Sequence, residues 1–307
     1  MKYTYVERNF SESSLGTITT VNSILDQYAH LGYDLSLRQL YYQMVARGYI
    51  ENSDRSYKNL GSLVSDSRLA GYIDWNMIQD RGRETIMPPR WKDPAEIVAA
   101  AASQFAIDRW ENQVNHIEVM VEKQALEGVL IPVCRETGVN FSANKGYSSS
   151  STMYQTGRRV QLKLLDGKDV YILYLGDHDP SGIDMTRDVG DRVRLFAEDE
   201  QVEVMRLALN FDQIEILNPP ENPAKTTDSR ARAYIAEFGM SSWELDAIEP
   251  TALADLVRRA VESLRDEDLW RETLQREALM RAELGSFVKS YSERNEPKAK
   301  AKPRRKK

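Results

Sequence analysis

The sequence predicts an α/β protein with two domains: a mainly helical N-terminal domain, then a domain with a mostly parallel sheet. Apolar residues recur at helical spacing through residues 1–90. From Asn115 onward, short apolar strands alternate with helix-like segments, which is typical of α/β domains. A chain of 307 residues is also long enough for two cores, because single domains usually contain about 100 to 200 residues.

The N-terminal domain, residues 1–90, is expected to contain three helices. They span residues 17–30, 37–48 and 56–70. In the second, LRQLYYQMVARGYI places apolar side chains three and four residues apart, and Ser36 and Gly48 can cap its two ends. The polar, arginine-rich segment IDWNMIQDRGRET follows. Three short helices before such a hairpin-like segment resemble a winged helix-turn-helix, with a generic helical bundle as the alternative.

Basic side chains of this domain are candidates for contact with the DNA backbone. They are Lys58 and Arg68 on the third helix, and Arg81 and Arg83 in the hairpin-like segment. The chain has a formal charge of −6, but its last ten residues, KAKAKPRRKK, hold seven basic side chains and no acid. Residues 291–307 are therefore expected to form a disordered basic tail, which could hold a polyanion loosely or serve only solubility.

The domain boundary is expected near MPPRWKD, residues 87–93, because two adjacent prolines favour an extended linker. The second domain then covers residues 91–290. It begins with the alanine-rich segment DPAEIVAAAASQFAIDRW, in which Asp93 can cap a helix and Pro94 suits its first turn.

Three strands are expected in the second domain, with helix-like segments between them. They are HIEVMVE from His116, VYILYL from Val170 and VEVMRLAL from Val202. Their apolar character indicates a largely parallel sheet buried on both faces. Ligands of such sheets bind at the carboxyl ends of the strands. Both the first and the second strand run into acidic residues at this end.

Composition favours an ordinary globular protein, with 41% hydrophobic and 29% charged residues. The N-terminus has no apolar segment that could act as a secretory signal, and no apolar run has the roughly 18 residues of a membrane span. The single cysteine, Cys134, cannot form an intrachain disulfide and is expected to be a buried thiol. We therefore expect a cytoplasmic protein, associated with the nucleoid if the source is bacterial.

Three acids at these strand ends are candidate metal ligands. Asp177 and Asp179 follow the VYILYL strand on alternate residues, and Glu122 ends the HIEVMVE strand. Converging carboxylates repel unless a cation bridges them. Hard oxygen ligands suit Mg²⁺, with Mn²⁺ as a substitute. Glu122 could also act as a general base, and Lys123 beside it could meet a phosphate. The alternative is that the aspartates only cap a helix or form a turn.

The combination of motifs resembles one family. GDHDPSG contains the D-x-D-x-x-G signature of Toprim domains, and VEKQAL resembles their glutamate motif. With NKGYSSS, LGDHDPSGIDM and WELDAIEP, the chain resembles the topoisomerase VI A subunit and its relative that makes meiotic double-strand breaks. The resemblance covers most of residues 115–250. It implies a winged-helix domain before a Toprim domain, cleavage of double-stranded DNA, and a homodimer with a shared active site. It also leaves room for a separate ATPase subunit as a partner.

The resemblance also assigns roles in the N-terminal domain. The family carries its nucleophilic tyrosine in an arginine-x-x-tyrosine-tyrosine helix, and RQLYY occupies Arg38 to Tyr42 here. Tyr42 would attack a backbone phosphate and leave a 5′-phosphotyrosyl link, with Arg38 as its electrostatic helper. A phenol with a pKa near ~10 needs such help at neutral pH. Tyr41 would be a packing partner, and ordinary core aromatics are the alternative for both tyrosines.

Two other functions remain open. In one, a Toprim nuclease cuts DNA hydrolytically with metal-activated water, and Tyr42 only packs. In the other, the chain is a DNA-binding or assembly subunit that never cleaves. The sequence contains no G-x-x-x-x-G-K-S/T nucleotide-binding motif, so strand passage would need a partner subunit. His178, between the two aspartates, is expected to point away from them.

Overall fold

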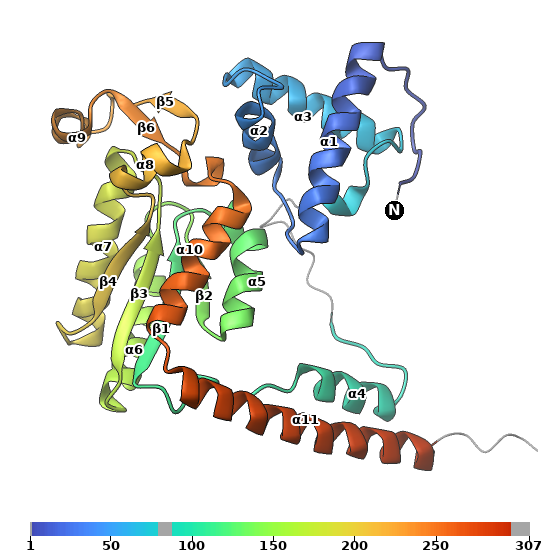
Figure 1. Cartoon of the computed structure of the whole chain (residues 1–307), viewed down its shortest axis with the longest axis vertical. Helices are drawn as coiled ribbons and strands as arrows, with labels where there is room; N and C mark the ends of the chain where they lie inside the picture. The colour runs from blue at the N-terminus through green and yellow to red at the C-terminus, as the bar shows by residue number, and fades with distance from the viewer. Residues whose placement is uncertain (1, 79–87, 296–307) are drawn as a thin grey trace, which may run out of the picture. The chain divides into compact units, whose positions relative to one another are not determined.

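The computed structural model describes residues 2–78 and 88–295 (Figure 1). The described residues divide into two compact units. The first combines residues 2–78 with 114–265, and the second combines 88–113 with 266–295. The expected domain ranges of 1–90 and 91–290 do not follow these units, and that division stays a prediction. Within the described residues, no helix is long and apolar enough to cross a membrane.

Three helices begin the first unit, close to the expected ranges. They are α1 (Glu12–His30), α2 (Leu37–Ala46) and α3 (Asp54–Leu69). A serine caps each of them, and at α2 Ser36 and Gln39 form a reciprocal capping box. The one-sided apolar spacing of these helices buries a common core that includes Val21, Leu40 and Val64.

The described part of the expected hairpin-like segment contains a short 3-10 helix, η1 (Trp75–Met77), and an isolated bridge between Leu35 and Ile78. The described residues of this segment, up to Ile78, form no β-hairpin. The rest of the segment, with Arg81 and Arg83, lies outside the described residues. The winged-helix arrangement therefore stays a prediction.

A four-stranded parallel sheet forms the centre of the first unit, in the order β2-β1-β3-β4. The strands are β1 (Asn115–Val121), β2 (Asn140–Ala143), β3 (Asp169–Leu175) and β4 (Glu203–Ala208). The parallel sheet confirms the α/β class and is compatible with a Rossmann-like domain. β2 was not expected, because its four residues, NFSA, are too few for a periodic signal.

Helices cover both faces of this sheet, and α6 and α7 lie on the face opposite α5 and α10 (Figure 1). They are α5 (Glu127–Thr137), preceded by η2 (Gln124–Leu126), then α6 (Ser150–Leu165), α7 (Pro180–Ala197) and α10 (Pro250–Ser263). Alternate β3 residues Val170, Ile172 and Tyr174 pack against α6 and α7. This double coverage explains why β3 reads as a continuous apolar run and why β1 is apolar apart from His116 and Glu118.

One buried charge interrupts this apolar interior. Glu118, in the middle of β1, forms an ion pair with Arg159 of α6 at 2.7 Å and contacts His116 at 3.2 Å. Burial raises the pKa of Glu118, but the hydrogen bonds from Arg159 and His116 outweigh burial and lower it to about 2. The carboxylate is therefore ionised inside the fold.

Smaller elements follow β4. They are α8 (Phe211–Leu217), β5 (Glu221–Pro223), α9 (Ala231–Phe238), β6 (Ser241–Trp243) and η3 (Leu245–Ala247). β5 and β6 pair as an antiparallel ribbon. η3 packs against α2, and Tyr28 of α1 donates a hydrogen bond of 2.6 Å to Glu249 at the start of α10. These contacts join the N-terminal helices to the sheet within one unit.

The second unit pairs α4 (Pro94–Gln104) with the long helix α11 (Glu267–Asn295). Asp93 caps α4 and Pro94 occupies its first turn, as the sequence predicts. The ring centres of Trp110 and Trp270 lie 6.0 Å apart, and the Arg109 guanidinium forms an ion pair of 2.9 Å with the Glu277 carboxylate.

Candidate active site at the carboxyl end of the sheet

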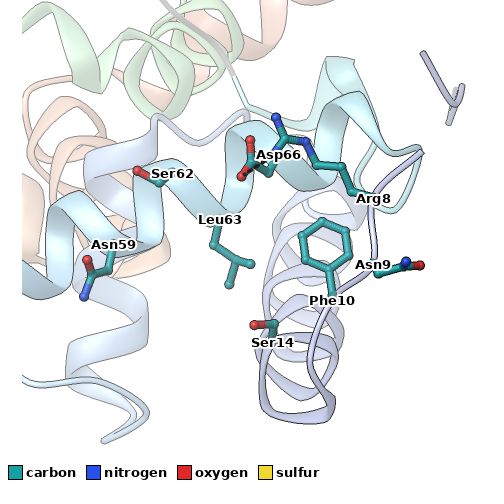
Figure 2. Close-up of a pocket in the computed structure, with 8 residues that line it drawn as sticks. All are labelled: Arg8, Asn9, Phe10, Ser14, Asn59, Ser62, Leu63 and Asp66. Atoms are coloured by element: carbon teal, nitrogen blue, oxygen red, sulfur yellow. Dashed lines mark ion pairs between the residues drawn. The ribbon is translucent and has the colours of Figure 1, made fainter. Parts of the chain in front are cut away.

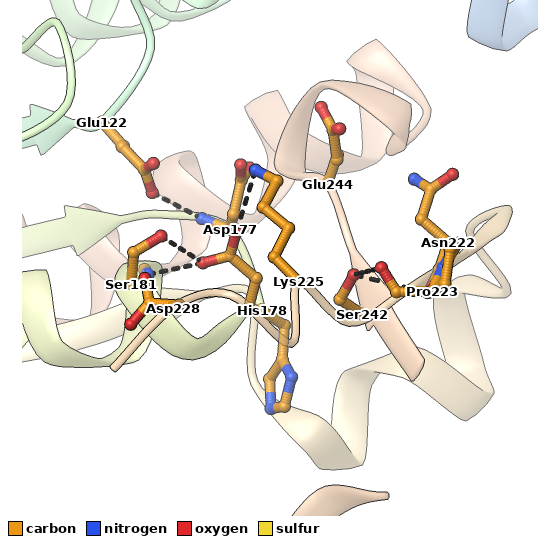
Figure 3. Close-up of polar contacts among 12 residues, drawn as sticks. Glu122, Asp177, His178, Ser181, Asn222, Pro223, Lys225, Asp228, Ser242 and Glu244 are labelled. Atoms are coloured by element: carbon orange, nitrogen blue, oxygen red, sulfur yellow. Dashed lines mark hydrogen bonds and ion pairs between the residues drawn. The ribbon is translucent and has the colours of Figure 1, made fainter. Parts of the chain in front are cut away.

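Glu122 follows the last residue of β1 and is 7% exposed. Its backbone N–H donates to the Leu175 carbonyl at 2.8 Å, which continues the pairing of β1 with β3. Its Oε2 atom accepts the backbone N–H of Asp177 at 2.8 Å (Figure 3). Burial raises the pKa of Glu122, so the side chain favours its protonated form more than an exposed glutamate does.

Asp177 lies two residues beyond the end of β3 and is 6% exposed. Its Oδ1 atom accepts the Leu245 backbone N–H at 2.8 Å, and its Oδ2 atom lies 2.8 Å from the Lys123 ammonium. Burial and the neighbouring acid Glu122 raise the pKa of Asp177, while Lys123 opposes this rise. The structure thus brings Asp177 and Glu122 together at the carboxyl ends of β1 and β3, where parallel sheets bind their ligands.

Asp179 lies in the same loop, but its carboxylate is turned toward α7. It caps this helix: Oδ1 accepts the Gly182 N–H at 2.6 Å and the Ser181 hydroxyl at 2.8 Å. Lys225 lies 3.6 Å from the other oxygen (Figure 3). A Cβ on Gly182 would overlap the Asp177 carbonyl, which explains the glycine of the D-x-D-x-x-G motif. The helix-cap alternative therefore describes Asp179 in this structure.

His178 points away from the acids, as expected (Figure 3). It is 1% exposed, and its ring packs among Tyr234, Phe238 and Trp243. Its Nδ1 atom lies 2.7 Å from the Tyr234 hydroxyl. Burial lowers its pKa to about 4, so the ring is neutral at pH 7 and anchors the loop by packing.

The chemistry of these three acids suits magnesium, but the arrangement of their side chains in the structure does not. Three buried carboxylates from Glu122, Asp177 and Asp179 form a donor set of hard oxygens. Their oxygens are held by backbone N–H groups, by the α7 cap and by Lys123. Within residues 2–78 and 88–295, no group of three or more His, Cys, Asp or Glu side chains is arranged to hold a metal ion. A magnesium site stays a prediction.

Lys123 pairs with Asp177 and with two further acids, Glu244 and Asp246. Its ammonium lies 2.8 Å from Asp177, 2.8 Å from Glu244 and 3.0 Å from Asp246. Three carboxylates around one ammonium raise the pKa of Lys123 although burial lowers it. Lys123 is therefore a protonated partner of the acids and is only 22% exposed.

Arg38 of α2 contacts two of these acids, Glu244 and Asp246. Its Nε atom lies 3.0 Å from Asp246 and 3.1 Å from Glu244, and its guanidinium donates a second hydrogen bond to Glu244. The guanidinium also donates to the Tyr42 hydroxyl at 3.3 Å. The helix with the predicted nucleophile is thereby linked to the acids at the sheet edge through charged side chains.

Tyr42 is 3% exposed, and burial raises its pKa to about 12. The charge of Glu244 adds to this rise, and Arg38 opposes it. Tyr41 packs edge-on against Tyr42 at 5.1 Å between ring centres, and its hydroxyl donates to Asn52 at 2.9 Å. The geometry places Tyr41 as a packing and hydrogen-bonding residue, whereas the Tyr42 hydroxyl lies beside the charged network.

Three residues of the site were not predicted from the sequence. Glu244 and Asp246 lie in WELDAIEP on alternate positions, the same spacing as Asp177 and Asp179, and that spacing was the available signal. Arg206 of β4 donates to the carbonyls of residues 176, 177, 182 and 209 and to the Thr186 hydroxyl, and so clamps the acidic loop. An arginine within the apolar strand VEVMRLAL was its signal.

The predicted DNA contacts are dispersed. Lys58 is exposed on α3. Arg68 donates to the carbonyls of Trp75 and Ile78, and its guanidinium lies 4.7 Å from the Trp75 ring centre, so it joins α3 to η1. Lys123 belongs to the acidic network. Contact of Lys58, Arg68 and Lys123 with DNA stays a prediction.

A pocket lies on the N-terminal helices of the first unit (Figure 2). An ion pair of 3.1 Å between Arg8 and Asp66 lies in its wall. The lining residues are Arg8, Asn9, Phe10, Ser14, Asn59, Ser62, Leu63 and Asp66. None of the predicted site residues lines it, so the strand-end acids and the α2 tyrosine remain the candidate site.

No family model matches the sequence, and no curated protein matches it either. The resemblance to the topoisomerase VI A subunit therefore rests on the motifs alone.

Proposed function

We propose that the protein cleaves the phosphodiester backbone of double-stranded DNA, with Tyr42 as the attacking group, in the manner of the topoisomerase VI A subunit. One observation carries the proposal. A continuous set of charged contacts runs from the Tyr42 hydroxyl through Arg38 and Glu244 to Lys123 and Asp177. Residues far apart in sequence thus meet at the strand ends, where α/β domains bind ligands.

In the proposed reaction the Tyr42 oxygen attacks phosphorus and the bond from phosphorus to the 3′ oxygen breaks. The products are a 5′-phosphotyrosyl link and a 3′ hydroxyl, and the proton lost by the phenol is balanced by the one gained at the 3′ oxygen. A phenol with a pKa of about 12 is almost entirely protonated at pH 7. Arg38 therefore has two tasks: it favours the phenolate and it neutralises charge on the phosphate.

Magnesium, with manganese as a substitute, is the proposed cofactor, and Glu122, Asp177 and Asp179 are the residues that would hold it. Bound there, the ion would supply positive charge to the phosphate oxygens. The residues of the chain act independently of it in the proposal: Arg38 and Lys123 orient the phosphate, and Tyr42 supplies the nucleophilic oxygen.

A covalent-trapping assay tests the tyrosine. Supercoiled DNA is incubated with the protein and magnesium or manganese, then denatured, and protein attached to 5′ ends is measured. We expect covalent product from the wild type and from Tyr49→Phe, a control in an exposed tyrosine, and none from Tyr42→Phe. Covalent product that persists in Tyr42→Phe would refute the role of this tyrosine.

The low exposure of Tyr42, 3%, favours a second candidate function, hydrolytic cleavage in which the tyrosine only packs. The same variants separate the two. Hydrolytic cleavage survives Tyr42→Phe, yields no covalent product, and is lost in Asp177→Ala or Glu122→Ala. DNA that is bound but never cut, with any metal or candidate partner, would instead identify a non-cleaving assembly subunit.

The proposed homodimer with a shared site has its own test. Tyr42→Phe and Asp177→Asn proteins are mixed, unfolded and refolded together to form mixed dimers. If Tyr42 acts on the acid site of the other copy, the mixed dimer keeps one intact site and nicks DNA. If Tyr42 acts with Asp177 of its own chain, as the contacts within one chain favour, the mixture stays inactive. A separate ATPase subunit remains a proposed partner.

A further inference from the structure

Arg38 and Lys123 converge on a single oxygen atom. The Oε2 atom of Glu244 lies 3.1 Å from the Arg38 Nε atom and 2.8 Å from the Lys123 ammonium. The two cations come from α2 and from the end of β1, elements that are about eighty residues apart in sequence. An oxygen held between an arginine and a lysine is the arrangement by which proteins bind a phosphate oxygen.

Asp246 keeps a second negative charge beside the two cations. Its Oδ1 atom accepts a hydrogen bond from Lys123 at 3.0 Å, and its Oδ2 atom lies 3.0 Å from the Arg38 Nε atom without a hydrogen bond. Its side chain is fully buried, and the Leu245 N–H beside it is anchored on Asp177 at 2.8 Å. When Glu244 leaves, Lys123 therefore keeps a hydrogen bond to Asp246 and Arg38 keeps an ion pair with it, and the hydrogen bonds of Arg38 to Glu244 become available to another acceptor.

Glu244 is also the most exposed of the three carboxylates around Lys123. Its side chain is 23% exposed, and those of Arg38 and Lys123 are 40% and 22% exposed. A phosphodiester carries one negative charge, the same as a carboxylate. Exchange of Glu244 for a backbone phosphate would therefore leave the charge of the site unchanged, whereas a phosphate added beside Glu244 would meet like charge.

We infer that Arg38 and Lys123 form a binding site for one backbone phosphate of DNA, and that the Glu244 carboxylate occupies this site until DNA displaces it. The Arg38 guanidinium also donates to the Tyr42 hydroxyl at 3.3 Å, so a phosphate in this position shares its arginine with the proposed nucleophile. The inference rests on the proposed DNA substrate, and it adds a competitor within the chain that lowers affinity for that substrate.

Binding is measured by fluorescence anisotropy with a short labelled duplex in EDTA, over a range of salt concentrations. Glu244→Gln keeps the size of the side chain and removes its charge. We expect this variant to bind about tenfold more tightly, because a charged competitor for two cations is gone. We also expect the slope of log affinity against log salt to steepen by roughly one to two, because the freed cations now release counterions to the phosphate.

Three variants control the measurement. Glu215→Gln makes the same charge change at an exposed position of α8 and should leave binding close to wild type. Glu244→Asp keeps the charge on a shorter side chain and should give a smaller gain in the same direction, which also tests the idea if Glu244→Gln folds poorly. Adding Lys123→Met to Glu244→Gln should remove the gain.

Unchanged or weaker binding by folded Glu244→Gln and Glu244→Asp overturns the inference, as does an equal gain from Glu215→Gln. The assay contains no divalent metal and measures no cleavage. A protein that gains affinity through Glu244→Gln but never cuts DNA would therefore refute the proposed reaction and leave the phosphate site standing. Cleavage by the wild type without any effect of Glu244→Gln on binding would refute the phosphate site and leave the proposed reaction standing.

Discussion

Lys123→Met removes the cation around which three carboxylates are grouped, and its effect on stability can be estimated from the structure. The Asp177 and Asp246 side chains are 8% and 0% exposed. Removing one partner of a buried ion pair typically costs about 3–5 kcal/mol, because the remaining charge is left uncompensated. Arg38 still pairs with Glu244 and Asp246, so we expect the lower end, about 3 kcal/mol. An exposed pair would cost at most about 1 kcal/mol.

Urea unfolding followed by far-UV circular dichroism measures this loss. Lys58→Met, the same substitution at an exposed position of α3, is the matched control and should change the free energy of unfolding by less than about 0.5 kcal/mol. Adding Asp177→Asn to Lys123→Met should cost less than the sum of the two single variants, because they share one ion pair. A Lys123→Met protein as stable as Lys58→Met would refute the claim that Lys123 stabilises the fold by pairing with Asp177, Glu244 and Asp246.

Two further predictions follow from glycine geometry and from a buried acid. Gly182→Ala should lower the free energy of unfolding by at least about 2 kcal/mol, because its Cβ would overlap the Asp177 carbonyl. The control Gly16→Ala, with open space around it in α1, should leave the free energy of unfolding unchanged or raise it by up to about 1 kcal/mol. Equal effects of the two substitutions would contradict this explanation. Glu118 has a pKa of about 2 in the folded state and near ~4.3 when unfolded, so its ion pair stabilises the fold above the unfolded value and is lost as the pH falls toward 2. Urea unfolding at pH 7 and pH 3 should show a loss of roughly 1.7 kcal/mol from this group in the wild type, a little over half of the about 3 kcal/mol that is lost once the pH is below 2. The loss should be clearly smaller in Glu118→Gln, and identical pH profiles would refute the role of Glu118.

Local patterns were enough for the long elements. α2 is specified by apolar residues at helical spacing together with the Ser36 and Gln39 capping box. β1 and β3 are specified by apolar runs long enough to cross a buried sheet. The acids Glu122 and Asp177 could be placed near each other because both follow parallel strands, whose carboxyl ends share one edge.

Short or context-dependent elements could not be predicted. β2 has only four residues, and its strand character comes from pairing with β1 along the register Glu118 to Asn140. The orientation of Asp179 was open as well, because an aspartate after a strand can hold a cation or cap a helix with equal ease. Here the Gly182 N–H and the Ser181 hydroxyl decide for the cap.

The sequence by itself determined the α/β class, the order of the main helices and strands, and the acids at the strand ends, because helix periodicity, capping and buried apolar runs are local properties. Only the tertiary structure decided which charges meet. In the folded chain Arg38 of α2 and Lys123, which follows β1, both contact Glu244 and Asp246. Such contacts join segments up to about two hundred residues apart, and their energies depend on burial and exact distance, which no local pattern encodes.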